Sequence, residues 1–206
     1  MRALRGPAPR TPQDYERSLA EITIGRPERL SGPIQLCEHD AAWPAAYRKE
    51  AARIRRALGA RARRLEHVGS TSVPGLAAKP IIDIVLEVSD PSDEPAYVPD
   101  LQDAGYVLRI REAEWFEHRM LRGTSPAVNL HVFGAGCPET QRMVRFRDWL
   151  RGHPPDRARY DSAKRELAAQ GWTYMQQYAD AKTSVIAAIL ERAGAASGES
   201  GHQPIG

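Results

Sequence analysis

The sequence predicts an α+β domain in which a mixed, largely antiparallel sheet is flanked by helices. Between residues 65 and 133, short runs of branched apolar residues are bounded by glycine, proline and aspartate, a pattern typical of strands. On either side of this region, apolar residues recur every three or four positions, which is typical of amphipathic helices. The 206 residues are enough to bury a hydrophobic core without disulfides or a structural metal.

The first expected helix covers residues 42–58. Apolar residues from Trp43 to Leu58 have helical spacing, Pro44 is acceptable in a first turn, and Asp40 lies close enough to help cap the helix. Five strands should follow, with a short helical turn near Leu101 between the second and the third. We expect the strands over residues 65–68, 81–88, 106–110, 115–121 and 128–133. The last three are consecutive, so an antiparallel arrangement is expected for them.

Three helices should complete the domain after residue 139, separated by the prolines at 154–155 and by Gly171. Their apolar stripes are Met143, Phe146 and Leu150; Tyr160, Ala163 and Leu167; and Met175, Tyr178, Val185, Ile186 and Ile189.

The chain divides into three parts. Residues 1–35 contain five prolines and are interpreted as an extended or partly ordered arm with one helical segment around residues 14–20. Residues 36–193 form the domain. Residues 194–206 are rich in glycine and serine without apolar periodicity, so we expect a disordered tail.

Composition limits where the protein works. Cys37 and Cys137 belong to no C-x-x-C pair, which argues against a zinc ribbon and suits a reducing compartment. No run of about 18 apolar residues is present, and the first ten residues lack the apolar core of a signal peptide. These features predict a cytoplasmic protein that does not enter a membrane.

The segment from Glu66 to Glu87 carries the most chemistry. A strand ends at Gly69, and a turn rich in hydroxyl groups follows before the next strand begins. Glycine lets a ligand approach the backbone, while the hydroxyls and main-chain donors of Ser70, Thr71 and Ser72 suit phosphate oxygens. The alternative is an ordinary turn in which Gly69 supplies geometry and the hydroxyls cap the backbone.

Asp83 lies in the second, otherwise apolar strand, where residues 83, 85 and 87 share one face. A buried carboxylate is costly unless it is paired or holds a cation, and Mg²⁺ with nucleotide phosphates is a common solution. Asp83 and Glu87 are therefore candidate metal ligands. Alternatively, Asp83 pairs with Lys79 or an arginine, and Glu87 has a structural role.

The motif from Glu66 to Asp83 resembles the signature of the GrpB-like family, which belongs by fold to the nucleotidyltransferase superfamily. The resemblance extends over residues 32–193. Further similar motifs are Asp40 with Trp43-Pro44, residues 115–119, 129–133 and 146–151, Tyr160 with residues 164–167, and residues 178–182.

The resemblance implies a nucleotidyltransferase-like fold and a site for a nucleotide with Mg²⁺. In the superfamily, a Gly-Ser pair precedes a strand that carries two carboxylates, and a later strand supplies a third acid. Gly69-Ser70 and Asp83 match this pattern. Val85 stands where the second carboxylate should be, and the later strand offers Asn129 and His131 instead of an acid. A two-metal mechanism needs several anionic ligands, so the resemblance implies an altered site.

Other residues are candidates because they lie within or beside these motifs. His131 could ligate a metal or act as a general base, or be a buried structural histidine. Arg119, Arg147 and Lys79 are candidate phosphate contacts. Candidate pocket residues are Glu66, His67, Asn129 and Lys182.

Two functions compete. The first is an enzyme that transfers a nucleotidyl or phosphoryl group from a nucleoside triphosphate to a small acceptor, with Asp83 and His131 as catalytic residues. The second is a nucleotide-binding or accessory module without turnover, which Val85 favours; family relatives fused to dephospho-coenzyme A kinase also imply such a role. The basic stretch at residues 48–64 is explained by a solvated helix face, which argues against nucleic acid as the partner.

Overall fold

The structure, a computed structural model, describes residues 12–199 of the chain. Five strands form one sheet: β1 (Arg64–Val68), β2 (Ile82–Val88), β3 (Tyr106–Glu112), β4 (His118–Thr124) and β5 (Ala127–Gly134). The sheet order is β1-β2-β5-β4-β3; β2 and β5 are parallel and the other neighbours are antiparallel. The predicted α+β class and the mixed five-stranded sheet are confirmed.

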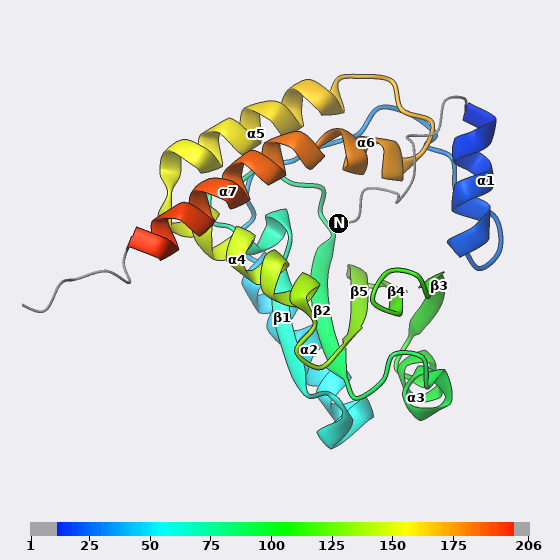
Figure 1. The fold of residues 1–206 in the computed structure, drawn as a ribbon. Coiled ribbons are helices and arrows are strands. Elements are labelled where there is room, and N and C mark those ends of the chain that lie inside the picture. The colour runs from blue at the N-terminus through cyan, green and yellow to red at the C-terminus, as the bar shows by residue number, and fades with distance from the viewer. Residues whose placement is uncertain (1–11, 200–206) are drawn as a thin grey trace, which may run out of the picture.

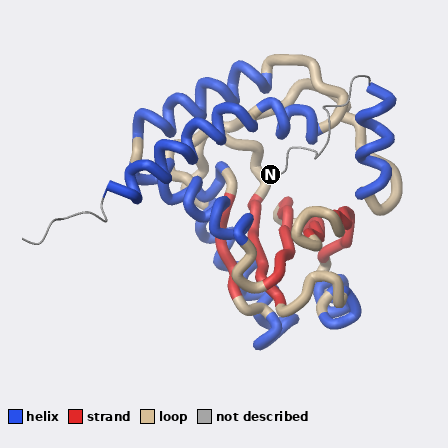
Figure 2. Tube along the Cα trace, viewed as in Figure 1, coloured by secondary structure: helices blue, strands red, loops and turns tan. Residues whose placement is uncertain are grey.

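Helices cover the sheet on both faces (Figures 1 and 2). They are α1 (Pro12–Ile22), α2 (Trp43–Leu58), α3 (Val98–Asp103), α4 (Pro138–Gly152), α5 (Pro154–Ala168), α6 (Met175–Ala181) and α7 (Thr183–Glu199), with short 3-10 turns η1 (Gly59–Arg61), η2 (Ser70–Ser72) and η3 (Glu94–Ala96). The largest core cluster joins α2 and α3 to one sheet face and includes Ile54, Ile84, Leu86, Leu130 and Val132. Alternation along each strand therefore sends Asp83, Asn129 and His131 to the opposite face.

Two elements differ from the sequence interpretation. β4 begins at His118 rather than at residue 115, because Phe116 and Glu117 have φ angles of 55° and 51° and make a tight turn. The third expected helix is two helices, α6 and α7, which are separated at Lys182. Apolar periodicity does not reveal this break because the stripe continues across it.

Both ends of the described chain are helical, and the helical segment expected around residues 14–20 is α1. Tyr15 and Leu19 of α1 are buried against Tyr174, and the Tyr15 hydroxyl donates to Asp180 Oδ2 at 2.5 Å. Part of the predicted arm is thus a helix packed on the domain. Helix α7 continues through residues 194–199 of the predicted disordered tail, where alanines favour the helix. Residues 1–11 and 200–206 lie outside the described residues.

Candidate functional site

A cluster of polar side chains around Asp83, the Asp83 pocket, lies at the end of the sheet where β1 ends and β2 begins. Val68 of β1 and Asn129 of β5 are the register neighbours of Asp83. The Asn129 side-chain amide donates a hydrogen bond of 2.9 Å to Asp83 Oδ1, and His131 Nε2 lies 3.9 Å from the same oxygen. The predicted placement of His131 beside Asp83 is confirmed, with Leu130 and Val132 packed on the opposite face.

The turn after β1 closes one side of this pocket. Gly69 has a φ of 69°, and a Cβ atom there would lie 2.3 Å from Asp83 Oδ2, so the position requires glycine. Of the three hydroxyl residues, only Ser70 is directed to the pocket, where its Oγ accepts a hydrogen bond of 2.9 Å from Lys164 Nζ. Thr71 Oγ1 and Ser72 Oγ instead bond to the carbonyls of Ile81 and Gly69.

These two hydroxyl groups therefore hold the turn together, as the alternative reading of the segment proposed. Each of these hydroxyl protons is already donated to a backbone carbonyl, so neither is free for a phosphate oxygen. The assignment of both hydroxyl groups to phosphate binding is corrected. The Arg151 guanidinium of α4 donates two hydrogen bonds, of 2.8 and 3.0 Å, to the Ser72 carbonyl. These bonds stabilise the turn.

Three lysines surround Asp83. Lys164 of α5 is 2% exposed and donates to Ser70 Oγ and to the Ala77 carbonyl. Lys182, at the α6–α7 junction, is 7% exposed, and its Nζ lies 4.2 Å from the centroid of the Tyr178 ring. Lys79, beside the start of β2, contacts Met175 Sδ at 2.9 Å. In the described part of the chain, none of the three forms an ion pair with a carboxylate.

Burial changes the protonation of these lysines. It lowers the pKa of Lys164 to about 8 and that of Lys182 to about 7, because a charged amine loses hydration there. The lysines repel one another, and the Asp83 charge opposes part of the shift. Burial would raise the pKa of Asp83, but His131, Asn129 and the Lys79 charge lower it on balance. Asp83 thus lies near three amines, two of which also interact with the charges of Asp161 and Asp180.

This donor set does not fit a two-metal centre. Residues 12–199 contain no group of three or more metal-ligating side chains. Glu87 lies four residues from Asp83 along β2, roughly 13 Å at the usual rise per residue. Its Oε2 accepts from the Gly136 backbone N–H at 3.2 Å, and apolar Val85 separates it from the pocket. The assignment of Glu87 as a metal ligand is therefore corrected to a structural role.

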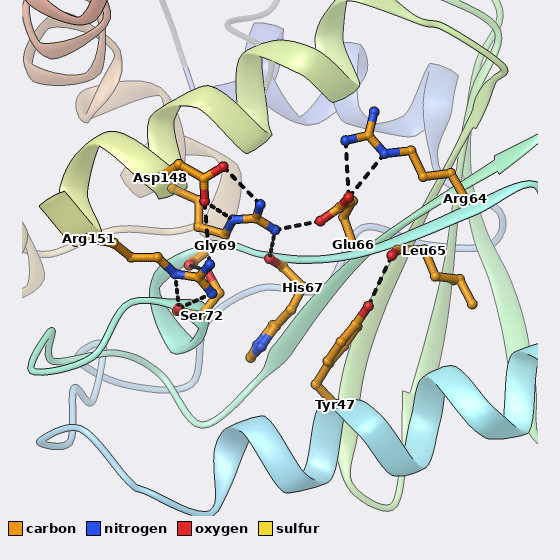
Figure 3. A network of polar contacts seen from close by, with 10 residues as sticks. Tyr47, Arg64, Leu65, Glu66, His67, Gly69, Ser72, Asp148 and Arg151 are labelled. Atoms are coloured by element: carbon orange, nitrogen blue, oxygen red, sulfur yellow. Dashed lines mark hydrogen bonds and ion pairs between the residues drawn. The ribbon is translucent and has the colours of Figure 1, made fainter.

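A second charged cluster, which includes Glu66 and Asp148, joins α4 to β1 (Figure 3). Arg147 donates to Glu66 Oε2 at 2.7 Å, to the His67 carbonyl at 2.9 Å and to both Asp148 oxygens. Arg64 binds the other Glu66 oxygen at 3.0 and 3.1 Å. Burial opposes the charge of Glu66, but these two arginines lower its pKa on balance. The cluster is internally paired, so the side chains of Glu66 and Arg147 both have structural contacts, and their role as ligand contacts stays a prediction.

Two further candidates face away from the pocket. His67 is paired with Ile84 on the α2 side of the sheet, where its ring stacks on Tyr47 with centroids 4.7 Å apart (Figure 3). Burial lowers the pKa of His67 to about 4. Arg119 is opposite Val132 on that same face and donates to Glu94 Oε1 at 2.6 Å. Neither side chain is a ligand contact, because strand alternation sends both to the wrong face.

Sequence reasoning missed two residues that reach His131. Glu112 of β3 and His118 of β4 continue the polar row across the sheet, with contacts of 2.8 Å from Glu112 Oε2 to His118 Nδ1 and 3.1 Å from His118 Nε2 to His131 Nδ1. The signal was available, because a β4–β5 hairpin places His118 diagonally beside His131.

Comparisons with known proteins agree with this fold. The sequence profile of the family described as GrpB protein matches residues 33–192. A UPF0157 protein of Halalkalibacterium halodurans is 52% identical over 185 residues, covering 90% of this chain and 94% of that protein. A dephospho-CoA kinase of Mycolicibacterium paratuberculosis is 30% identical over 77% of this chain, which spans 44% of that kinase.

A solved structure supports the same relationship. The crystal structure of the conserved protein GrpB from Enterococcus faecalis superposes with a TM-score of 0.66 at 28% identity, covering 77% of this chain and 96% of that one. Among residues 12–199, no helix combines the length and apolar character that a membrane crossing requires. Because the family profile covers most of the chain and the fold agrees, this protein belongs to the GrpB family.

Proposed function

We propose that the Asp83 pocket binds the phosphate chain of a nucleoside triphosphate and promotes transfer of a nucleotidyl or phosphoryl group to a small acceptor. The observation that carries this proposal is the set of three lysines, Lys79, Lys164 and Lys182, none of which has an ion-paired carboxylate within the described residues. Buried amines without a carboxylate at ion-pair distance favour an anion, and a phosphate chain offers several oxygens in a row.

The chemistry would rest on positioning and charge. Lysines close to the reacting phosphate can neutralise the negative charge that develops in the transition state. Gly69 lets the Asp83 carboxylate pack directly against the turn, and the Ser70 hydroxyl can contact a phosphate oxygen. His131, beside Asp83 and part-exposed, is the group suited to take a proton from the acceptor.

Magnesium would enter with the nucleotide. Asp83 is a single carboxylate, and Mg²⁺ often uses one or two protein carboxylates together with phosphates and water. In this proposal the lysines supply the positive charge that a second metal provides in a two-metal enzyme. A nucleoside triphosphate and two free cysteines suit a reducing cytoplasm, where we expect the protein to work.

The second candidate is a nucleotide-binding module without turnover. Val85 favours it, because this position lies on the Asp83 face and is apolar and fully buried. The relative named dephospho-CoA kinase also fits an accessory role, because a region similar to this chain occupies less than half of that protein. In either function the pocket binds the same phosphate chain.

Calorimetry of the purified chain tests the proposal. ATP, GTP, CTP, UTP and inorganic tripolyphosphate are titrated with and without Mg²⁺, followed by assays for pyrophosphate and nucleoside diphosphate release with pools of small acceptors. Binding followed by release supports the enzyme, and binding without release supports the module. Absence of binding by every triphosphate would overturn both.

The Asp83→Asn variant adds a sharper test. We expect weaker binding of the Mg²⁺–nucleotide complex but stronger binding of metal-free tripolyphosphate, since the site then holds only positive charges. Asp90→Asn, an exposed aspartate after β2, is the matched control and should change neither.

A further inference from the structure

A row of polar side chains leads from the Asp83 pocket into the sheet. Glu112 of β3, His118 of β4 and His131 of β5 lie on the face that carries Asp83. Glu112 Oε2 is 2.8 Å from His118 Nδ1, and His118 Nε2 is 3.1 Å from His131 Nδ1. The rings of the two histidines are within 21° of parallel, with centroids 5.3 Å apart. The proposed function uses His131 but gives no role to Glu112 or His118.

The surroundings of His118 fix its ring. His118 is 3% exposed; its face stacks on Phe133 at 4.7 Å between centroids, and Trp115 approaches it at 5.0 Å and 73°. The left-handed turn at Phe116 and Glu117 sits between Trp115 and the start of β4. Burial lowers the pKa of His118 to about 4, so its ring is neutral at pH 7. A neutral imidazole has one N–H donor and one acceptor nitrogen.

These contacts indicate which ring nitrogen of each histidine carries the proton. An ionised Glu112 only accepts hydrogen bonds, so His118 Nδ1 carries the proton that lies between them. His118 Nε2 is then the acceptor, and it receives the N–H of His131 Nδ1. In the tautomer that this hydrogen-bond pattern favours, the other His131 nitrogen, Nε2, is the acceptor, and it lies 3.9 Å from Asp83 Oδ1. Two acceptors at this separation suit a hydroxyl group that donates to one of them.

We propose that Glu112 and His118 are positioning residues that hold His131 as the Nδ1–H tautomer, with Nε2 free to accept the proton of the acceptor hydroxyl. This inference rests on the proposed function. In the transfer step, the acceptor O–H bond breaks and its proton moves to His131 Nε2, while the oxygen forms a bond to phosphorus. The phosphorus–oxygen bond to the leaving group breaks, and pyrophosphate or a nucleoside diphosphate departs with the electron pair. Two hydrogen bonds, one from His118 Nδ1 to Glu112 and one from His131 Nδ1 to His118 Nε2, thus orient the proton acceptor.

Nitrogen-15 NMR of histidine-labelled protein tests the relay without any substrate. We expect His131 to show a protonated Nδ1 and an unprotonated Nε2 at neutral pH in the free protein. His118→Phe keeps an aromatic ring between Trp115 and Phe133 but removes the acceptor, so the His131 proton should move to Nε2 beside Asp83. Glu112→Leu should cause the same change, because His118 would then carry its proton on Nε2. A wild-type His131 protonated only at Nε2 would overturn the relay.

Two further variants separate the relay from packing. His118→Gln offers a side-chain oxygen to His131 Nδ1, so it should restore the wild-type tautomer that His118→Phe loses. Met120→Leu changes a side chain opposite His131 that takes no part in the relay, and it should leave the tautomer as it is. If Met120→Leu moves the proton as His118→Phe does, local packing rather than His118 controls the tautomer.

Kinetics tests the catalytic consequence. We expect His118→Phe to lower kcat about 100-fold with an unchanged KM for nucleotide, and His118→Gln to recover part of the loss. If the NMR results hold but the wild-type protein catalyses no transfer, the proposed function fails while the relay stands. If transfer occurs and His118→Phe leaves kcat unchanged, Glu112 and His118 do not position the proton acceptor.

Discussion

Two charged clusters lie on the same face of the sheet and differ in one respect. Around Asp83, three lysines have no ion-paired carboxylate in the described residues. Between α4 and β1, the guanidinium groups of Arg64 and Arg147 are bonded to Glu66 and Asp148. Both clusters contain residues that the sequence indicates as ligand contacts. Only the Asp83 pocket has charges left for a ligand.

The difference separates binding from stability. An internally paired arginine has little to offer a phosphate, because a ligand would have to displace a carboxylate that is already in place. A buried lysine without a counter-ion costs free energy in the unliganded protein, and an anion recovers that cost on binding. Removing a charge from the Asp83 pocket should therefore change the affinity for triphosphate. Removing a charge from the cluster between α4 and β1 should change the free energy of unfolding.

The largest effect is expected for Lys164→Met. Lys164 is almost fully buried and contacts Ser70 at the turn, so it should lie against the phosphate chain. Loss of a charged hydrogen bond should weaken triphosphate or tripolyphosphate binding about 100-fold, or about 2.7 kcal/mol. Calorimetry gives the affinity, circular dichroism confirms folding, and Lys49→Met on the exposed face of α2 is the control. Unchanged affinity would show that the phosphates bind elsewhere.

Arg147→Met should have the opposite profile. It leaves Glu66 with Arg64 alone and removes the bond to the His67 carbonyl, so the free energy of unfolding should fall by about 2 kcal/mol. Urea denaturation measures this change. Triphosphate affinity should stay within about twofold of wild type because the pocket is untouched. A stable variant that no longer binds triphosphate would move Arg147 into the binding site.

Most of the sheet could be predicted from the sequence because branched apolar runs and strand alternation are local signals. Gly69 and Asp83 could be brought together for the same reason, since a strand, a turn and a second strand form one local unit. His67 was assigned to the wrong face of β1, because successive side chains of a strand point to opposite faces. Glu66 and Val68 share the Asp83 face, whereas His67 faces Tyr47.

Charge pairing was harder to predict because it depends on residues distant in the chain. Glu66 and Arg147 are 81 positions apart, and Ser70 and Lys164 are 94 apart, so neither contact has a local signature. The sequence indicated Arg147 as a phosphate contact and Lys182 as a pocket residue. Only the packing of α4 and the α6–α7 junction shows that Arg147 is paired and that Lys182 is not.

The pH dependence of triphosphate affinity should be the next largest effect. Lys182, with a pKa of about 7, faces Lys79, Lys164, Asp83 and Asp180, and Lys164 has a pKa of about 8. An anion prefers charged amines, so triphosphate affinity should fall about tenfold as pH rises from 6.5 to 9. Calorimetry in buffers of different ionisation heat would show proton uptake on binding.

The stability of the free protein should change in the opposite direction. In the unfolded chain these lysines have ordinary, higher pKa values, so above pH 7 the unfolded state binds more protons and stability rises with pH. Saturating tripolyphosphate should reduce this rise. Lys182→Met should remove the fall in affinity near pH 7 and the part of the rise in stability that begins near pH 7. If affinity is flat across this range in wild type, the lysines do not contact the ligand.

Glu87→Gln should have the smallest effect, although Glu87 shares the Asp83 face of β2. Glu87 Oε2 accepts from the Gly136 N–H, a role that a glutamine oxygen can keep, and Oε1 has no hydrogen-bond partner within the described residues. The free energy of unfolding should change by less than about 1 kcal/mol and Mg²⁺–nucleotide affinity by less than about twofold. Urea denaturation and calorimetry of Glu87→Gln and of Asp83→Asn compare the effects of two carboxylates on the same strand. If Glu87→Gln weakened the complex as much as Asp83→Asn, both carboxylates would act together, and charge from the lysines could not replace a second acidic ligand.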